Sequence, residues 1–333
     1  MLTLHEKIIS DNHPVFIIAE AGVNHNGSVN NAIQLVDAAL NAGADAIKFQ
    51  LFNTAKLNVK NNSLLKSLEF SKEKMAAIKQ YCDQSGILFL CTPFDEESAS
   101  TLQRLNVEAF KIGSGDLTNL PLLNCVASFR KPIILSTGMS GLHDIETALT
   151  FLPGTVKVAL LHCTSAYPAP FAELNLNVIH TLKAAFGKIV GYSDHSQGLA
   201  VPFAAAALGY KIIEKHITLD KNLPGPDHIA SMEPADFKEL VCGIRNIEKA
   251  LGSPAKQVMP SEQQTKKAAR RGIYLKSDLP ENHKLTVDDL MFLRPLSAIE
   301  ACHYQSVIGK VLTRPKRKGT SLTWQDLLPE DGA

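Results

Sequence analysis

Two lysines stand inside apolar runs of this sequence, at positions where they could hold an anion. Lys48 and Gln50 are two residues apart near the end of the run Ala44 to Gln50, so the pleat of a β-strand would put both side chains on one face. Lys111 has the equivalent position in the run Ala109 to Gly113. A charged lysine is costly to bury unless an anion meets it. These residues therefore predict a pocket for a phosphate or a carboxylate.

Hydroxyl groups and a glycine-flanked turn would add hydrogen-bond donors to this pocket. Gly113, Ser114 and Gly115 follow Lys111, and their backbone could approach an oxyanion closely. Hydroxyl side chains also stand at the ends of other β-rich runs, at Thr92, Ser136 and Ser193. Each hydroxyl taken alone is equally compatible with turn capping, so the prediction depends on the set.

Two histidines follow late β-rich runs and predict a metal site. His195 comes two residues after the run Ile189 to Ser193, and His216 lies in the run Tyr210 to Thr218. On neighbouring strands their imidazoles would reach one ion. Two neutral ligands leave positions for water and substrate oxygens, which favours Mn²⁺, or Mg²⁺, as a Lewis acid over a closed zinc site. A histidine considered singly is more often a hydrogen-bonded core or rim residue, so that alternative stays open.

Eight β-rich runs alternate with helical patterns and would position all these groups. The runs are Phe16 to Glu20, Ala44 to Gln50, Ile87 to Thr92, Ala109 to Gly113, Pro132 to Thr137, Val156 to His162, Ile189 to Ser193 and Tyr210 to Thr218. Amphipathic patterns such as Val29 to Ala42 and Ser71 to Gln84 predict helices between them. Nearly continuous apolar strands favour a parallel sheet covered by helices, and eight units favour a closed TIM (β/α)8 barrel. Catalytic groups of such barrels project from the C-terminal strand ends.

An open doubly wound sheet is the competing α/β architecture. It normally has a glycine-rich dinucleotide turn after its first strand. The sequence from Glu20 to Gly27, which follows the first run, does not fit GxGxxG. The barrel is therefore the preferred fold.

A chain of 333 residues is longer than one barrel of about 250 residues. We expect a barrel domain over 1–252, a linker over 253–266 and a small β-rich domain over 267–333. Short strands are predicted at Gly272 to Leu275, Leu290 to Leu293 and Val307 to Val311. The segment 253–333 has 13 Lys and Arg against 9 Asp and Glu. This excess would suit an anionic substrate, although four charges are usually a solvated face.

Composition excludes several classes of function. A formal net charge of +1 gives no field that would recruit nucleic acid or an acidic membrane surface. The sequence has no apolar stretch long enough to cross a bilayer and no apolar segment typical of a signal peptide. Its six cysteines are scattered without a CxxC pair. We therefore expect a cytoplasmic protein that binds neither nucleic acid nor membranes.

Two other functions remain compatible with these residues. A desolvated lysine could form a Schiff base, as in a pyruvate lyase, although polar neighbours here favour charged lysine. A non-catalytic sugar-binding protein would also have a polar pocket.

Motifs in order along almost the whole chain closely resemble the sialic acid synthase family, which includes legionaminic and pseudaminic acid synthases. They are the segments Phe16 to Gly27, Lys48 to Gln50, Thr92 to Phe94, Lys111 to Asp116, Leu135 to Met139, Leu161 to Cys163, Tyr167-Pro168, Gly191 to His195, Glu214 to His216 and Gly225 to Asp227. The tail, with Arg270-Arg271, Arg294-Pro295 and Gly309-Lys310, looks like the antifreeze-like (SAF) domain that follows the TIM barrel in this family.

The resemblance implies condensation of phosphoenolpyruvate with an N-acetylated mannosamine-type aldehyde to a nonulosonic acid, with release of phosphate. N-acetylmannosamine is the first expected acceptor, and a 2,4-diacetamido-2,4,6-trideoxy hexose is the alternative. It also implies a homodimer in which the SAF domain covers the partner's barrel.

The resemblance further implies a role for each matching residue. His195 and His216 would bind Mn²⁺, and Glu20 would be the acid/base group. Phosphoenolpyruvate would be held by Lys48, Thr92, Lys111, Ser114, Ser136 and Ser193. Further substrate contacts would come from Gln50, Asp116, Tyr167, Asp227 and, in the partner's site, Arg294.

Overall fold

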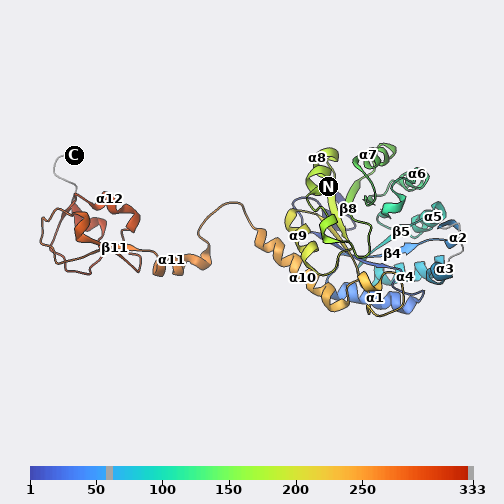
Figure 1. Cartoon of the computed structure of the whole chain (residues 1–333), viewed down its shortest axis with the longest axis horizontal. Coiled ribbons are helices and arrows are strands. Elements are labelled where there is room, and N and C mark those ends of the chain that lie inside the picture. Colours follow the sequence, from blue (N-terminus) through green and yellow to red (C-terminus); the bar gives the residue numbers. More distant parts are fainter. Residues whose placement is uncertain (58–62, 329–333) are drawn as a thin grey trace. The chain divides into compact units, whose positions relative to one another are not determined.

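The chain divides into two units, Met1–Gly252 and Ser253–Ala333, shown in the computed structural model of Figure 1. The structure describes residues 1–57 and 63–328. Each unit has its own cluster of buried apolar side chains. Each is therefore described by itself.

The first unit is a nearly closed parallel barrel, which confirms the predicted TIM fold. Within the described residues its strands form one eight-stranded sheet in the order β5-β4-β3-β10-β9-β8-β7-β6, and β5 and β6 also lie side by side. The strands are β3 (Phe16–Gly22), β4 (Ala46–Leu51), β5 (Leu88–Pro93), β6 (Phe110–Ile112), β7 (Ile133–Ser136), β8 (Val158–Cys163), β9 (Ile189–Asp194) and β10 (Ile212–His216).

Helices surround the strands, as Figure 1 shows. They are α1 (Val29–Ala42), α4 (Lys72–Ser85), α5 (Glu96–Arg104), α6 (Leu120–Ser128), α7 (Leu142–Phe151), α8 (Val178–Phe186), α9 (Ala200–Leu208) and α10 (Pro234–Leu251), with short α2 (Thr54–Leu57) and α3 (Ser63–Leu68) between β4 and α4. Ser28 caps α1 by accepting a hydrogen bond from the Asn31 N–H, and Gly43 ends it in the left-handed region at φ 83°. In the described part of the chain, no helix combines the length and apolar character needed to cross a membrane.

Alternation along the strands divides the barrel's apolar residues into two layers. Ile17 and Ile47 belong to the large cluster packed with the helices, whereas Phe16, Ile18 and Ala46 belong to a smaller cluster inside the barrel. An antiparallel N-terminal hairpin, β1 (Leu2–Leu4) and β2 (Lys7–Ile9), adds buried Leu2, Leu4 and Ile9 to this inner cluster. The hairpin, which the sequence analysis did not predict, therefore fills the N-terminal end of the barrel and leaves the other end for chemistry.

The second unit has short antiparallel strand pairs around its own core. Its elements are α11 (Gln263–Ala269), β11 (Gly272–Leu275), β12 (Leu290–Leu293), α12 (Tyr304–Val307), β13 (Val311–Leu312) and β14 (Leu327–Leu328). β11 pairs with β12, and β13 with β14. The strand predicted over Val307 to Val311 is wrong, because a helix ends at Val307 and β13 begins only at Val311. Helix α11 begins inside the segment 253–266, which was expected to be a linker, and the predicted domain end, 329–333, lies outside the described residues.

Candidate active site

A cavity of about 490 Å³ lies at the C-terminal ends of the barrel strands. Most of the residues proposed from the sequence line it, although they come from distant parts of the chain. They are Glu20, Lys48, Gln50, Thr92, Lys111, Ser114, Ser136, Tyr167, Ser193, His195, His216 and Asp227. The barrel therefore gathers the predicted chemistry at one end.

The strand pleat explains why these side chains face inward. In β4, Ala46 belongs to the inner core, and Lys48 and Gln50 line the cavity two and four residues later. In β10, Ile212 is followed in the same way by Glu214 and His216. Inward positions are thus apolar deep in the barrel and polar toward the C-terminal strand ends.

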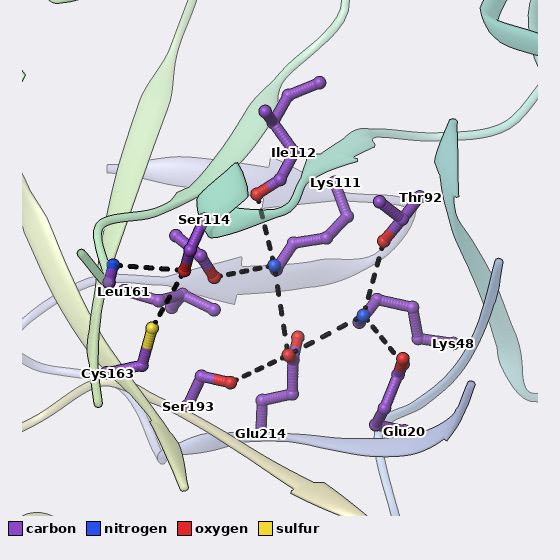
Figure 2. Close-up of polar contacts among 12 residues, drawn as sticks. Glu20, Lys48, Thr92, Lys111, Ile112, Ser114, Leu161, Cys163, Ser193 and Glu214 are labelled. Carbon is purple, nitrogen blue, oxygen red and sulfur yellow. Dashed lines mark hydrogen bonds and ion pairs between the residues drawn. The ribbon is translucent and has the colours of Figure 1, made fainter. Parts of the chain in front are cut away.

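Four buried ionisable groups form one charged layer across the cavity (Figure 2). Lys48 Nζ lies 2.7 Å from Glu20 Oε2 and 3.6 Å from Glu214 Oε1, and Lys111 Nζ lies 3.9 Å from the same Glu214 oxygen. Each side chain is at most 5% exposed. Two carboxylates therefore compensate two lysines in the absence of an external anion, where the sequence analysis expected only a bound anion to do so.

Burial and charge give the two carboxylates different proton affinities. Burial raises the pKa of Glu20, and the Glu214 charge adds to this while Lys48 opposes it. Burial also acts to raise the pKa of Glu214, but Lys111 and Lys48 outweigh it and lower that pKa to about 2. Glu214 therefore stays an anion near pH 7, and Glu20 is the carboxylate of the pair that takes up a proton more readily.

The lysines differ in the same way. Burial would lower the pKa of Lys48, but Glu20 and Glu214 outweigh it and raise that pKa. For Lys111 burial dominates, and its pKa is lowered. Lys111 is thus the less compensated cation and the one that gains more from a nearby anion.

Hydroxyl groups surround both ammonium groups. Lys48 Nζ donates to Thr92 Oγ1 at 3.3 Å, and Lys111 Nζ donates to Ser136 Oγ at 2.7 Å. Ser193 Oγ donates to Glu214 Oε1 at 2.9 Å. Thr92 and Ser136 accept in these bonds, so their hydroxyl hydrogens remain available to an incoming anion, whereas the Ser193 hydrogen is already donated to Glu214.

Ser114 is held in a separate small cluster beside this layer. Its Oγ accepts from the Gly138 N–H at 3.0 Å and lies 3.1 Å from Cys163 Sγ (Figure 2). A Cβ atom on Gly138 would lie 2.8 Å from both Ser114 Oγ and Cys163 Sγ, so only glycine fits there. Because Gly138 has no side chain, its backbone N–H can approach the Ser114 hydroxyl.

The imidazoles of His195 and His216 face each other with ring centroids 5.5 Å apart. His195 Nδ1 lies 2.9 Å from the Thr164 carbonyl oxygen, which can only accept, so Nδ1 carries the proton and Nε2 keeps its lone pair. His216 Nδ1 is buried and has no hydrogen-bond partner among the described residues. Burial lowers the pKa of both, that of His216 to about 4. Both are neutral near pH 7, as metal ligands must be.

This pair fits a divalent metal ion that takes its other ligands from elsewhere. No group of three or more His, Cys, Asp or Glu side chains that could hold a metal occurs in residues 1–57 and 63–328. Two free imidazole nitrogens with no further protein ligand leave the remaining positions to water and substrate oxygens. The donor set is therefore that of an open site rather than a closed structural one.

Two proposed residues lie outside the cavity lining. Asp116 lies in a 3₁₀ turn, where its Oδ1 accepts from Asn119 Nδ2 at 3.0 Å. Arg294 is an exposed residue of the second unit, directly after β12 and before a cis Arg294–Pro295 bond. Asp116 does not line this cavity, and its predicted substrate contact stays a prediction.

Several residues of the lining, among them Glu214 and Cys163, were given no role from the sequence. Glu214 is the anion shared by both lysines, and its position two residues before His216 on an inward-facing strand could have indicated it. Cys163 lines the cavity beside Ser114, two residues after inner-core Leu161. Alternation along the strands indicates that both side chains face inward. The contacts of Glu214 with Lys48 and Lys111 depend on how β4, β6 and β10 converge, which alternation does not reveal.

Comparisons with known proteins agree with this geometry. Residues 35–256 match the NeuB family, and residues 270–328 match the SAF domain. The chain is 42% identical to the N,N'-diacetyllegionaminic acid synthase of Campylobacter jejuni, over 90% of this chain and 96% of that one. It is 37% identical to the human N-acetylneuraminate-9-phosphate synthase, over 85% and 84%.

A solved structure shows the same similarity. The N-acetylneuraminic acid synthetase of Leptospira borgpetersenii serovar Hardjo-bovis, in complex with citrate, superposes with a TM-score of 0.75 at 40% identity. The match covers 79% of this chain and 94% of that one. The family matches therefore fall in both units, and the structural similarity covers 79% of the chain.

Proposed function

The chain belongs to the NeuB family, and from that premise we propose that it is a nonulosonic acid synthase. It is a transferase that condenses phosphoenolpyruvate with an N-acetylated amino sugar and releases phosphate. The observation that carries the proposal is the buried layer of Lys48 and Lys111 with Glu20 and Glu214, next to two neutral imidazoles. This arrangement supports binding of a small, highly charged anion beside an electrophilic centre.

In this proposal Lys48 and Lys111 bind the phosphate and carboxylate of phosphoenolpyruvate. Hydroxyl donors complete the anion site, from Thr92, Ser114, Ser136 and Ser193. The C3 atom of phosphoenolpyruvate then bonds to the aldehyde carbon of the acceptor, water adds at C2, and phosphate leaves. Glu20, whose pKa burial raises, would hold or pass the proton at the water or the sugar hydroxyl.

A divalent metal, Mn²⁺ or Mg²⁺, would be held by His195 and His216 and would polarise the acceptor aldehyde when bound. The acceptor would contact Gln50, Tyr167 and Asp227, which line the same cavity. N-acetylmannosamine is the first acceptor to test. The 42% identity to a diacetyllegionaminic acid synthase supports a 2,4-diacetamido-2,4,6-trideoxy hexose as the second.

We further propose that the enzyme works in the cytoplasm as a homodimer in which Arg294 contacts the acceptor in the partner's barrel. The support is the SAF match over residues 270–328, which includes this arginine. All six cysteines are free, which fits a reducing compartment.

The decisive experiment measures phosphate release from phosphoenolpyruvate with both acceptor sugars, with Mn²⁺ and with a chelator. We expect release only when an acceptor and a metal are both present. Turnover that survives chelation would contradict the imidazole metal site. A pyruvate adduct trapped on a lysine by borohydride would instead support the Schiff-base lyase, and acceptor binding without phosphate release would support a sugar-binding protein.

A further inference from the structure

A fully buried ion pair joins the two residues that precede His195 and His216 in the sequence. Lys215 Nζ lies 2.6 Å from Asp194 Oδ2, and the two side chains are 1% and 0% exposed. Asp194 ends β9 next to His195, and Lys215 lies in β10 next to His216. The two charged residues are also register partners of the β9–β10 ladder.

This pair does not belong to the anion pocket. Neighbouring Ser193, Glu214 and His216 line the cavity, and alternation turns Asp194 and Lys215 to the opposite face of the sheet. Neither residue is among those that line the cavity. A buried ion pair is seldom more stabilising than well-packed apolar residues of similar volume. Its presence between these two strands therefore calls for a reason other than stability.

The hydrogen bonds around the pair fix the loop that carries His195. Asp194 Oδ1 accepts from both the Ser196 N–H at 2.9 Å and Ser196 Oγ at 2.7 Å. Lys215 Nζ also donates to the Ser196 carbonyl oxygen. The backbone on both sides of His195 is thus bonded to the strand that ends in His216.

The ring of His195 is then oriented from the other side. Its Nδ1–H donates to the Thr164 carbonyl oxygen, which follows β8, and Tyr167 lies against it with ring centroids 4.2 Å apart. Asp194 and Lys215 fix the position of the His195 backbone, and the Thr164 carbonyl fixes the rotation of the His195 ring. Groups that orient a metal-ligating histidine commonly change metal affinity 10- to 100-fold when they are removed.

We propose that Asp194 and Lys215 are positioning residues that hold His195 and His216 at the separation required to share one divalent metal ion. The inference rests on the proposed metal site of this enzyme. It predicts that the pair affects metal affinity and leaves the anion pocket, on the opposite face of the strands, unchanged.

The test is a titration of the full-length, substrate-free protein with Mn²⁺, in which electron paramagnetic resonance reports the free ion. We expect Lys215→Met to weaken Mn²⁺ binding about 10- to 100-fold. The double variant Asp194→Asn with Lys215→Met leaves no uncompensated charge in the interior, so it keeps its fold even if the single variant does not, and we expect the same loss. Lys215→Arg keeps the charge and should recover part of the affinity.

Arg245→Met is the matched control, because it removes an ion pair with Asp45 at the N-terminal end of the barrel. It should bind Mn²⁺ like the wild type, and no variant should change phosphoenolpyruvate affinity measured without metal by more than about twofold. Wild-type Mn²⁺ affinity in the folded double variant would overturn the positioning role alone. Absence of Mn²⁺ binding by the wild-type protein would overturn the metal site and the positioning role together.

Discussion

At the scale of residues, the charged layer of the cavity contains one lysine whose charge is only partly compensated by protein groups. Lys111 is 3% exposed, and burial acts against its charge. Its compensation is incomplete, because Glu214 lies 3.9 Å from Lys111 and is shared with Lys48. Such a group contributes most when an anion arrives, so its removal should weaken anion binding, and it should also leave Glu214 with less compensation.

Replacing Lys111 by methionine tests both effects. We expect the KM for phosphoenolpyruvate to rise at least about 100-fold, because a desolvated charge pair with the substrate is lost. We expect the melting temperature without substrate to fall, because Glu20 and Glu214 then share only Lys48 and a buried carboxylate charge is left uncompensated. Phosphate-release kinetics and thermal unfolding measure the two effects.

The matched variant is Lys183→Met, which removes a partly exposed pair with Asp11. It should leave the KM unchanged and the stability within about 0.5 kcal/mol. A Lys111→Met enzyme with normal KM would remove this lysine from the anion site.

At the scale of elements, the strands were the part of the fold most accessible from sequence. Continuous apolar runs predicted both ends of all eight barrel strands to within two residues, for example Ile189 to Ser193 against the observed Ile189–Asp194. The reason is physical, since a parallel strand covered on both faces must be apolar along most of its length. Polar residues at strand ends then indicated the site.

Features that depend on tertiary contacts were not predictable in this way. The hairpin of β1 and β2 is only three residues per strand, and it is stable because Leu2, Leu4 and Ile9 enter the barrel. The role of Glu214 depends on three strands converging on one point. Helix α12 was not predicted, because four residues are too few to show a helical period, and the strand predicted over Val307 to Val311 starts at its last residue.

Gly191 tests how tightly the barrel strands pack. It lies in β9, and a Cβ atom there would come within 2.5 Å of Ile212 Cβ and of Leu161 Cδ2. Both neighbours belong to the inner core. We expect Gly191→Ala to destabilise the barrel by about 1–3 kcal/mol, because the extra methyl group forces these strands apart. Urea unfolding measures the change.

Gly154→Ala provides the comparison within the same unit. A Cβ atom at Gly154 meets nothing within 4 Å, and its φ is not positive. This variant should be as stable as the wild type or more stable by up to about 1 kcal/mol. Equal stability of the two variants would contradict tight packing, because it would show that the strands around Gly191 accept a methyl group without a cost in free energy.

At the scale of the whole molecule, the two units have separate cores and should unfold separately. The core of the second unit is small, and a buried carboxylate organises one side of it. Asp326 is 1% exposed and accepts from Lys316, from Arg314 Nη2 at 2.8 Å and from Thr323 N at 2.9 Å. Removing it would leave several donors without their acceptor.

Asp326→Ala should therefore lower the stability of the second unit by about 2–4 kcal/mol and leave the unfolding of the barrel unchanged. Calorimetry of the full chain separates the two transitions. Exposed Glu281→Ala in the same unit is the control and should shift neither transition. A shift of the barrel transition in Asp326→Ala would contradict independent unfolding.

The same carboxylate predicts an acid sensitivity confined to the second unit. Burial acts to raise the pKa of Asp326, but hydrogen bonds from Lys316 and Thr323 outweigh it and hold the pKa below its ordinary 3.8. The stability that these bonds contribute is therefore complete above the ordinary pKa and is lost as the pH falls from about 4 toward the lowered value. Asp326→Ala should abolish this dependence.

The proposed dimer makes a prediction that neither unit alone could satisfy. If Arg294 acts in the partner's barrel, Arg294→Ala should impair acceptor use far more than it lowers the melting temperature.

A mixed dimer of Arg294→Ala and His216→Ala subunits would then contain one complete site, built from an intact barrel and the arginine of the other chain. Random mixing should restore about a quarter of the wild-type sites, since half of the dimers are mixed and each has one complete site of two. Phosphate release from the refolded mixture, compared with each variant alone, measures this recovery. If Arg294 acts within its own subunit, every site in the mixture lacks either His216 or Arg294, and activity stays at the average of the two parents.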